Sequence, residues 1–129
     1  MMLKVVLTTV LMLSALPALA GDPKAGAQVF KKCQACHAVG EDAKNKVGPE
    51  LNGLFGRPAG SIPDYNYSDP MKNSGIVWSQ ETFAEYIANP KAMVPGTAMA
   101  FVGLKRPKEI EDIIAFLDQF NPDGTMKPH

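Results

Sequence analysis

The chain has 129 residues, of which 46% are hydrophobic and 20% are charged. That length suffices for one compact domain and is too short for two. The 13 lysines and arginines balance 13 aspartates and glutamates, and the lack of a basic excess to neutralise phosphates argues against nucleic acid as a partner.

Residues 1–20 have the pattern of a secretory signal peptide. Lys4 supplies a weak basic start, residues 5–16 form an almost continuous apolar run, and Ala18-Leu19-Ala20 is a small-residue cleavage site. The run is shorter than the about 20 residues that a membrane span needs, which argues against an uncleaved anchor. We therefore expect a cleaved signal peptide, 1–20, and a working domain, 21–129, outside the cytoplasm.

An amphipathic helix is predicted from Asp22 to Cys33. Asp22 is a good N-cap, and Pro23 suits the first helical position. Apolar side chains then recur at helical spacing, ending at Cys33. The helix therefore leads directly into the motif that follows.

The residues Cys33-Gln34-Ala35-Cys36-His37 have the C-x-x-C-H spacing of covalent haem attachment. Two thiols one helical turn apart can form thioethers to the two vinyl groups of one porphyrin, and the adjacent imidazole then lies under the iron. We expect one haem c, with Cys33 and Cys36 as attachment points and His37 as an axial ligand of the iron.

Two other interpretations of the motif are weaker. A thioredoxin-like redox pair would follow a strand in a βαβ unit, and no strand is predicted before Cys33. Half of a zinc site would need two more Cys or His ligands nearby. The chain has only two cysteines, and its only other histidine is His129.

Residues 38–68 are rich in Gly and Pro and show no strand alternation. A loop of this length inside a small domain normally argues against an assignment. A haem resolves the difficulty, because loops can wrap around a large ligand and bury their apolar side chains on it.

Three further helices are predicted. A short one begins at Asp69-Pro70 and stops near Gly75, and another is capped by Ser79 and ended by Asn89-Pro90. The last begins at Pro107 and is stopped by Asn121-Pro122. Its apolar stripe consists of Ile110, Ile113, Ile114, Leu117 and Phe120. The tail, 122–129, is expected to be frayed.

The second face of the iron decides between functions, because an open position permits ligand binding or peroxide chemistry and a filled one gives electron transfer. Beyond the signal peptide the methionines are Met71, Met93, Met99 and Met126. A methionine is more often core filler than a ligand. Met99 is nevertheless the preferred candidate, since the rigid turn Pro95-Gly96-Thr97-Ala98 can present it inward. Met93 is the second candidate for this ligand. His129 could serve only if the C-terminal tail folded back across the domain.

Five segments give the chain a resemblance to the class I cytochromes c, and most of all to the bacterial cytochrome c2 group. They are Cys33 to His37, Val47 to Arg57, Gly75 to Trp78, Tyr86 to Lys91 and Pro95 to Phe101. The similarity covers nearly all of residues 22–120. It implies an all-α fold, a single class I cytochrome c domain with three main helices and one or more short ones wrapped around one covalently bound haem.

The resemblance also implies roles for individual residues. It places Met99 on the family's axial methionine, and Pro49 on the proline whose carbonyl accepts the Nδ1 hydrogen of the axial histidine, His37. Tyr86 matches a tyrosine that hydrogen-bonds near the methionine sulfur, and Gly26 and Phe30 match the crossing of the first and last helices, where Phe116 or Leu117 should meet them. The positions that bind or shield haem propionates are matched by Arg57, Tyr67, Trp78 and Thr97.

Two departures from the family pattern concern the haem surroundings. Ala98 stands where mitochondrial relatives carry a lysine on the exposed haem edge, and Met71 replaces a polar residue near the haem interior. The first weakens a positive docking face, and the second bears on the reduction potential. A basic rim could still come from Lys31, Lys32, Lys46, Lys91, Lys105 and Lys108.

These inferences together predict a soluble, monomeric, periplasmic one-electron carrier that is not an enzyme. By resemblance, its partners are membrane redox complexes, a quinol-oxidising complex upstream and a reaction centre or terminal oxidase downstream, with no stable membrane anchor. The alternative is a small haem enzyme or ligand-binding protein with a labile sixth site. That alternative needs a distal acid or base, and no Glu or Arg lies near Met99 in the sequence.

Overall fold

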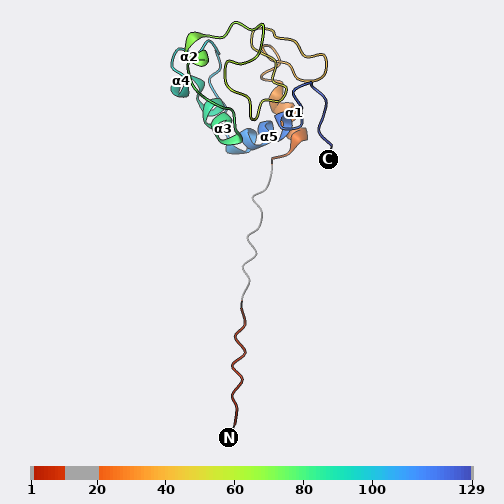
Figure 1. Ribbon diagram of the computed structural model, residues 1–129, viewed down its shortest axis with the longest axis vertical. Coiled ribbons are helices and arrows are strands. Elements are labelled where there is room, and N and C mark those ends of the chain that lie inside the picture. Colours follow the sequence, from red (N-terminus) through yellow and green to blue (C-terminus); the bar gives the residue numbers. More distant parts are fainter. Residues whose placement is uncertain (1, 11–20, 129) are drawn as a thin grey trace.

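The three longer helices lie on one side of the molecule, and the long loop that follows the C-x-x-C-H motif lies opposite them (Figure 1). The computed structural model describes residues 2–10 and 21–128. Within these ranges it has five helices and no strand, with only two isolated β-bridges. The helices are α1 (Pro23–Phe30), α2 (Asp69–Lys72), α3 (Gln80–Ala88), α4 (Pro90–Met93) and α5 (Pro107–Leu117). The prediction of an all-α fold with three main and additional short helices is confirmed.

Helix α1 begins as predicted and ends earlier. The Asp22 carboxylate accepts a hydrogen bond from the Lys24 amide at 2.9 Å, with Pro23 in the first turn. The helix ends at Phe30, so its predicted extension to Cys33 is wrong. Hydrogen-bonded turns follow instead, in which the Cys33 amide donates to the Phe30 carbonyl at 2.8 Å and the His37 amide to the Cys33 carbonyl at 2.9 Å. These turns continue the chain directly from the end of α1 through the two cysteines to His37.

Helices α1 and α5 cross at Gly26, where only a glycine fits. A Cβ at this position would lie 2.0 Å from the Asp112 carbonyl oxygen and 2.6 Å from the Phe116 Cβ. Beside it the rings of Phe30 and Phe116 have centroids 5.1 Å apart. The predicted meeting of the first and last helices is confirmed, and it joins the two ends of the domain.

The three helices between α1 and α5 also follow local signals in the sequence. Helix α3 begins with a capping box, in which the Thr82 amide donates to the Ser79 hydroxyl at 3.1 Å and the Ser79 amide to the Thr82 hydroxyl at 2.7 Å. Asn89-Pro90 ends α3 as predicted and also begins α4, since the Asn89 side chain accepts from the Ala92 amide. Helix α2 begins at Asp69 as predicted, with Ser68 as its N-cap.

The C-terminal tail is folded back onto the domain, so the expectation of a frayed tail is wrong for its described part. The Lys127 amide donates to the Gln119 carbonyl at 2.7 Å, and the Asn121 amide to the Thr125 carbonyl at 2.8 Å. Gly124 packs so closely on Gly40 that a Cβ there would lie 2.2 Å from the Gly40 carbonyl oxygen. The alternative ligand His129 and residues 1 and 11–20 of the predicted signal peptide lie outside the described residues. Among the residues described, no helix is long and apolar enough to cross a membrane.

Replacing Gly26 with alanine should destabilise the protein, although alanine is the better helix former. The new Cβ would collide with the backbone of α5, and such overpacking typically costs about 1–3 kcal/mol. Urea unfolding followed by circular dichroism would measure the loss. Gln28→Ala, an exposed change in the same helix, is the control and should be close to neutral. Equal stability of the two variants would contradict the crossing described above.

Candidate functional site

A cavity of about 430 Å³ lies between the helices and the long loop, and its wall is mainly apolar. Its size is within the range of about 300–1,000 Å³ typical of sites for cofactors and other small molecules. Every site residue predicted from the sequence lines it: Cys33, Cys36, His37, Pro49, Arg57, Tyr67, Trp78, Tyr86, Thr97 and Met99. Residues that are as far apart as 66 positions in the sequence are thus brought to one place.

The orientation of His37 is fixed by a backbone carbonyl. Its Nδ1 lies 2.7 Å from the Pro49 oxygen. Because a carbonyl only accepts, Nδ1 must carry the hydrogen, which leaves the Nε2 lone pair of the neutral ring free to bind a metal. Burial is the main cause that lowers the pKa of His37, and the charges of Arg57 and Lys46 act in the same direction, against the Pro49 hydrogen bond. The imidazole is therefore favoured in its neutral, metal-binding form.

Gly48 is a site residue that the sequence reasoning missed. A Cβ at this position would lie 2.4 Å from His37 Cε1. Only a glycine therefore allows the loop to approach the imidazole closely enough for the neighbouring Pro49 carbonyl to accept its hydrogen bond. The available signal was the glycine directly before Pro49, which becomes informative only once the loop is known to contact the ring.

Met99 lies in a segment in which exposed and partly buried side chains alternate. Ala98 and Ala100 are exposed, whereas Met99 is partly buried and packs against the core. The Tyr86 hydroxyl lies 3.5 Å from the Met99 Sδ and 3.0 Å from the Thr97 Oγ1. Since a thioether only accepts, the Tyr86 hydroxyl donates to sulfur, and one sulfur lone pair remains for a metal.

The other methionines differ in their relation to the cavity. Met71 also lines it, whereas Met93 and Met126 do not. Met93, the second choice from the sequence, ends α4 and packs against the hydrophobic core instead. The geometry therefore favours Met99 over Met93 as a candidate ligand.

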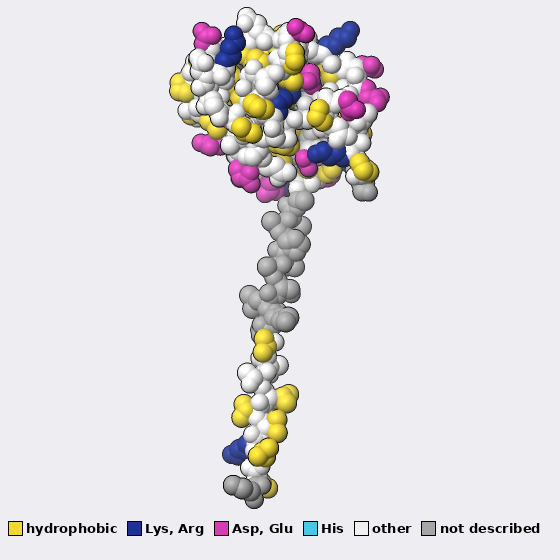
Figure 2. Space-filling model, in the orientation of Figure 1, with side chains coloured by type: hydrophobic (Ala, Val, Ile, Leu, Met, Phe, Trp, Pro, Cys, Tyr) yellow, Lys and Arg dark blue, Asp and Glu magenta, His cyan; other side chains and the backbone are white. Residues whose placement is uncertain are grey.

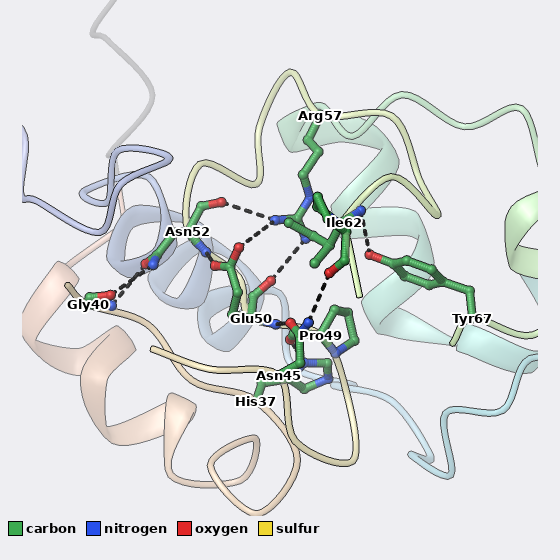
Figure 3. Close-up of polar contacts among 10 residues, drawn as sticks. His37, Gly40, Asn45, Pro49, Glu50, Asn52, Arg57, Ile62 and Tyr67 are labelled. Carbon is green, nitrogen blue, oxygen red and sulfur yellow. Dashed lines mark hydrogen bonds and ion pairs between the residues drawn. The ribbon is translucent and has the colours of Figure 1, made fainter. Parts of the chain in front are cut away.

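A polar group of residues from the long loop lies beside His37 (Figure 3). The Arg57 guanidinium donates to the Asn52 carbonyl at 3.1 Å and to the Glu50 carbonyl at 3.2 Å. The Tyr67 hydroxyl accepts from the Ile62 amide at 3.1 Å and keeps its own hydrogen for another partner. Because both Arg57 and Tyr67 line the cavity, they provide donors for an anionic group there.

Neither alternative interpretation of the cysteine motif fits the described part of the chain. Cys33 and Cys36 are not joined in a disulfide, and burial is the main cause that raises the pKa of the Cys33 thiol. A thiol–disulfide enzyme needs the opposite, an acidified thiol. For a zinc site, residues 2–10 and 21–128 contain no group of three or more His, Cys, Asp or Glu side chains that could hold a metal ion.

The residues around the cavity fit a covalently attached haem. An apolar wall of suitable size suits the macrocycle, two thiols offer attachment points, and an unprotonated imidazole nitrogen and a thioether offer axial ligands. Arg57 and Tyr67 offer donors to propionates, which need partners when they are partly buried. The fold and the cavity together define a single-haem protein of the c type.

Comparisons with known proteins agree with this class. The family model for cytochrome c matches residues 23–121. Cytochrome c2 of Blastochloris viridis is 55% identical over 118 residues, covering 92% of this chain and 93% of that protein. Cytochrome c-550 of Bradyrhizobium diazoefficiens is 60% identical over 103 residues, covering 80% and 76%. The structure of cytochrome c2 from Rhodospirillum centenum has a TM-score of 0.75 at 40% identity and covers 79% of this chain and 100% of that one. The chain belongs to the cytochrome c family, and its cofactor is a covalently attached haem c.

Replacing Tyr86 with phenylalanine should make the free energy of unfolding fall less steeply as the pH rises into the alkaline range. Burial is the main cause that raises the pKa of Tyr86, and its hydrogen bond with Thr97 partly opposes this. The neutral phenol is thus favoured in the folded state, so its contribution to stability is complete below the ordinary pKa of about 10 and is lost as the pH rises through the higher folded value. Tyr86→Phe removes this contribution.

Urea unfolding between about pH 8 and pH 11 would measure the effect, which should be a smaller slope of unfolding free energy against pH in the variant. At neutral pH the same substitution should cost about 1 kcal/mol, because the hydrogen bonds to Thr97 and Met99 are lost. An identical slope in the two proteins would contradict the assignment of a titrating Tyr86.

Proposed function

We propose that this protein is a soluble, periplasmic carrier of single electrons and not an enzyme. The proposal rests above all on one observation: His37 and Met99 both line the cavity that contains the two thiols, and each has its donor group oriented by a hydrogen bond. When bound, the haem supplies an iron that accepts and releases one electron. The imidazole of His37 and the thioether of Met99 would hold the iron from two sides and would leave no position for a substrate.

The protein's own residues would serve mainly to hold the site constant. His37 is restrained by the Pro49 carbonyl, and Met99 by the Tyr86 hydroxyl, and these hydrogen bonds would hold both side chains in place as ligands. The apolar wall excludes water, which is consistent with the burial of Trp78 and Tyr86 against each other at a ring distance of 5.1 Å. Arg57 and Tyr67 would bind the propionates.

The alternative of a haem enzyme or ligand-binding protein receives less support from the cavity. Catalysis at an open sixth site would need an acid or base near it. Among the described residues, 2–10 and 21–128, those that line the cavity include no Asp, no Glu and no histidine other than His37. Near Met99 the polar groups are the hydroxyls of Tyr86 and Thr97, which are bonded to each other.

Processing and location follow from the N-terminal sequence. The signal pattern of 1–20 supports export to the periplasm and cleavage after Ala20. We expect the protein recovered from the periplasm of its bacterial host to start at Gly21, and intact mass spectrometry should give the mass of 21–129 plus one haem. A mass that includes residues 1–20 would contradict cleavage.

The partners would be membrane redox complexes that meet the protein transiently as donor and acceptor, with the protein itself monomeric. Lys32 is exposed at the rim of the cavity, where it pairs with Glu109 at 3.2 Å, and the exposed Lys46 donates to the Gln34 carbonyl at 2.6 Å. On the face shown in Figure 2 acidic and basic side chains are interspersed. Steering by a few local lysines, rather than by a strongly basic face, is consistent with this distribution.

The function is tested by the spectrum and potential of the purified holoprotein. A reduced-minus-oxidised spectrum should show a c-type haem and, in the oxidised state, the weak band of a methionine–iron bond. Met99→Ala should remove that band and lower the reduction potential by a sizeable part of the ~0.8 V range that axial ligands span, since a thioether favours reduced iron. Met93→Ala, which alters a methionine outside the cavity lining, is the matched control and should keep both.

Carbon monoxide separates the carrier from the alternative. The reduced wild-type protein should not bind it at neutral pH, whereas Met99→Ala should. Ready binding by the wild type, or an unchanged potential in Met99→Ala, would refute the proposed ligation.

A further inference from the structure

Glu50 is a carboxylate next to the cavity to which neither the family pattern nor the proposed ligand set gives a role. Its side chain is only 17% exposed, and its own backbone is restrained because its amide donates to the Asn45 side chain at 3.0 Å. One carboxylate oxygen, Oε2, accepts from the Asn52 amide at 2.7 Å. The other, Oε1, lies 3.9 Å from the Arg57 Nη1. Glu50 is therefore held in one position beside the guanidinium (Figure 3).

Arg57 is similarly restrained, and its side chain is 13% exposed. Its Nη1 and Nη2 donate to the carbonyls of Asn52 and Glu50, and it lines the cavity. A charge with so little access to water is screened less than a surface charge. Its effect should therefore reach across the cavity wall.

The electrostatics of Tyr67 are consistent with an effect of the Arg57 charge across the cavity wall. Burial is the main cause that raises the pKa of Tyr67, and the hydrogen bond from the Ile62 amide and the positive charge of Arg57 act against it. Glu50 acts on Tyr67 in the opposite direction and raises its pKa. At Tyr67, on the cavity wall, the carboxylate thus offsets part of the field of the guanidinium.

We propose that Glu50 is a positioning residue that sets the reduction potential through Arg57. Its carboxylate holds the guanidinium against the loop carbonyls and offsets the positive charge at the cavity. A positive charge there favours the reduced state of a bound redox group, because reduction adds one negative charge. Glu50 therefore keeps the potential lower than Arg57 alone would set it. This inference rests on the proposed electron-carrier function.

The test is a redox titration of the holoprotein with Glu50→Gln, which preserves shape and removes the charge. We expect a higher potential, equivalent to a shift of roughly threefold to tenfold in the equilibrium constant for reduction by a common donor. Glu50→Asp retains the charge and should stay closer to wild type. The matched control is Glu85→Gln, an exposed glutamate on α3, whose charge is screened by solvent and should leave the potential nearly unchanged.

A second titration asks whether Glu50 acts through Arg57. In an Arg57→Gln background, Glu50→Gln should raise the potential less than in the wild type, because no guanidinium remains to be released. Equal shifts in the two backgrounds would overturn the positioning role. Urea unfolding of each holoprotein separates this effect from loss of stability, since a purely structural role would lower stability and leave the potential unchanged.

The two proposals fail in different ways. If the wild-type holoprotein shows no reversible one-electron couple, the carrier function fails. If the wild type has that couple and Glu50→Gln matches the Glu85→Gln control in potential, the role of Glu50 is overturned and the carrier function stands.

Discussion

The central cavity is the feature on which the rest of the structure depends. In most domains of this size the helices and loops bury their apolar side chains on one another. Here Tyr65, Met71 and Phe101 line the cavity wall together with the helical core residues Ile113 and Leu117. The largest part of the core is thus a shell shaped for a bound group. This explains why a long loop without strands is ordered: its apolar residues need that group as their packing partner.

The two candidate iron ligands are held in different ways, and the difference follows from their places in the chain. His37 lies at the end of the turns after α1, and the backbone carbonyl of Pro49 restrains its ring. Because the acceptor belongs to the backbone, rotation of the Pro49 side chain does not alter this hydrogen bond. Met99 follows a turn and is restrained by the hydroxyl of Tyr86 from α3. A change in α3 can therefore act on the methionine while the histidine side stays as it is.

Local patterns predicted most of the helices and the cysteine motif, the family resemblance predicted long-range contacts such as that of Gly26 with the last helix, and contacts covered by neither were missed. The C-x-x-C-H spacing, the capping signals and the turn before Met99 are local, and the cysteines, helices and inward methionine follow from them. The packing of Gly124 on Gly40 and the pairing of Glu50 with Arg57 join loops whose approach no local pattern encodes. The end of α1 at Phe30 was also missed, because tighter turns continue the same apolar spacing.

The segment around Met99 carries a candidate ligand and, on either side of it, small side chains that lie between the cavity and solvent. Ala98 and Ala100 are exposed and also line the cavity, so at these positions one methyl group separates cavity from solvent. A lysine in place of Ala98 would add a charge and a long, strongly hydrated side chain at this rim. Its absence leaves a small apolar surface on which a partner can approach closely. Under the proposed function, short-range contact at this surface sets how closely a partner approaches, and the charges of Arg57 and Glu50 on the inner side contribute to the driving force through this protein's potential.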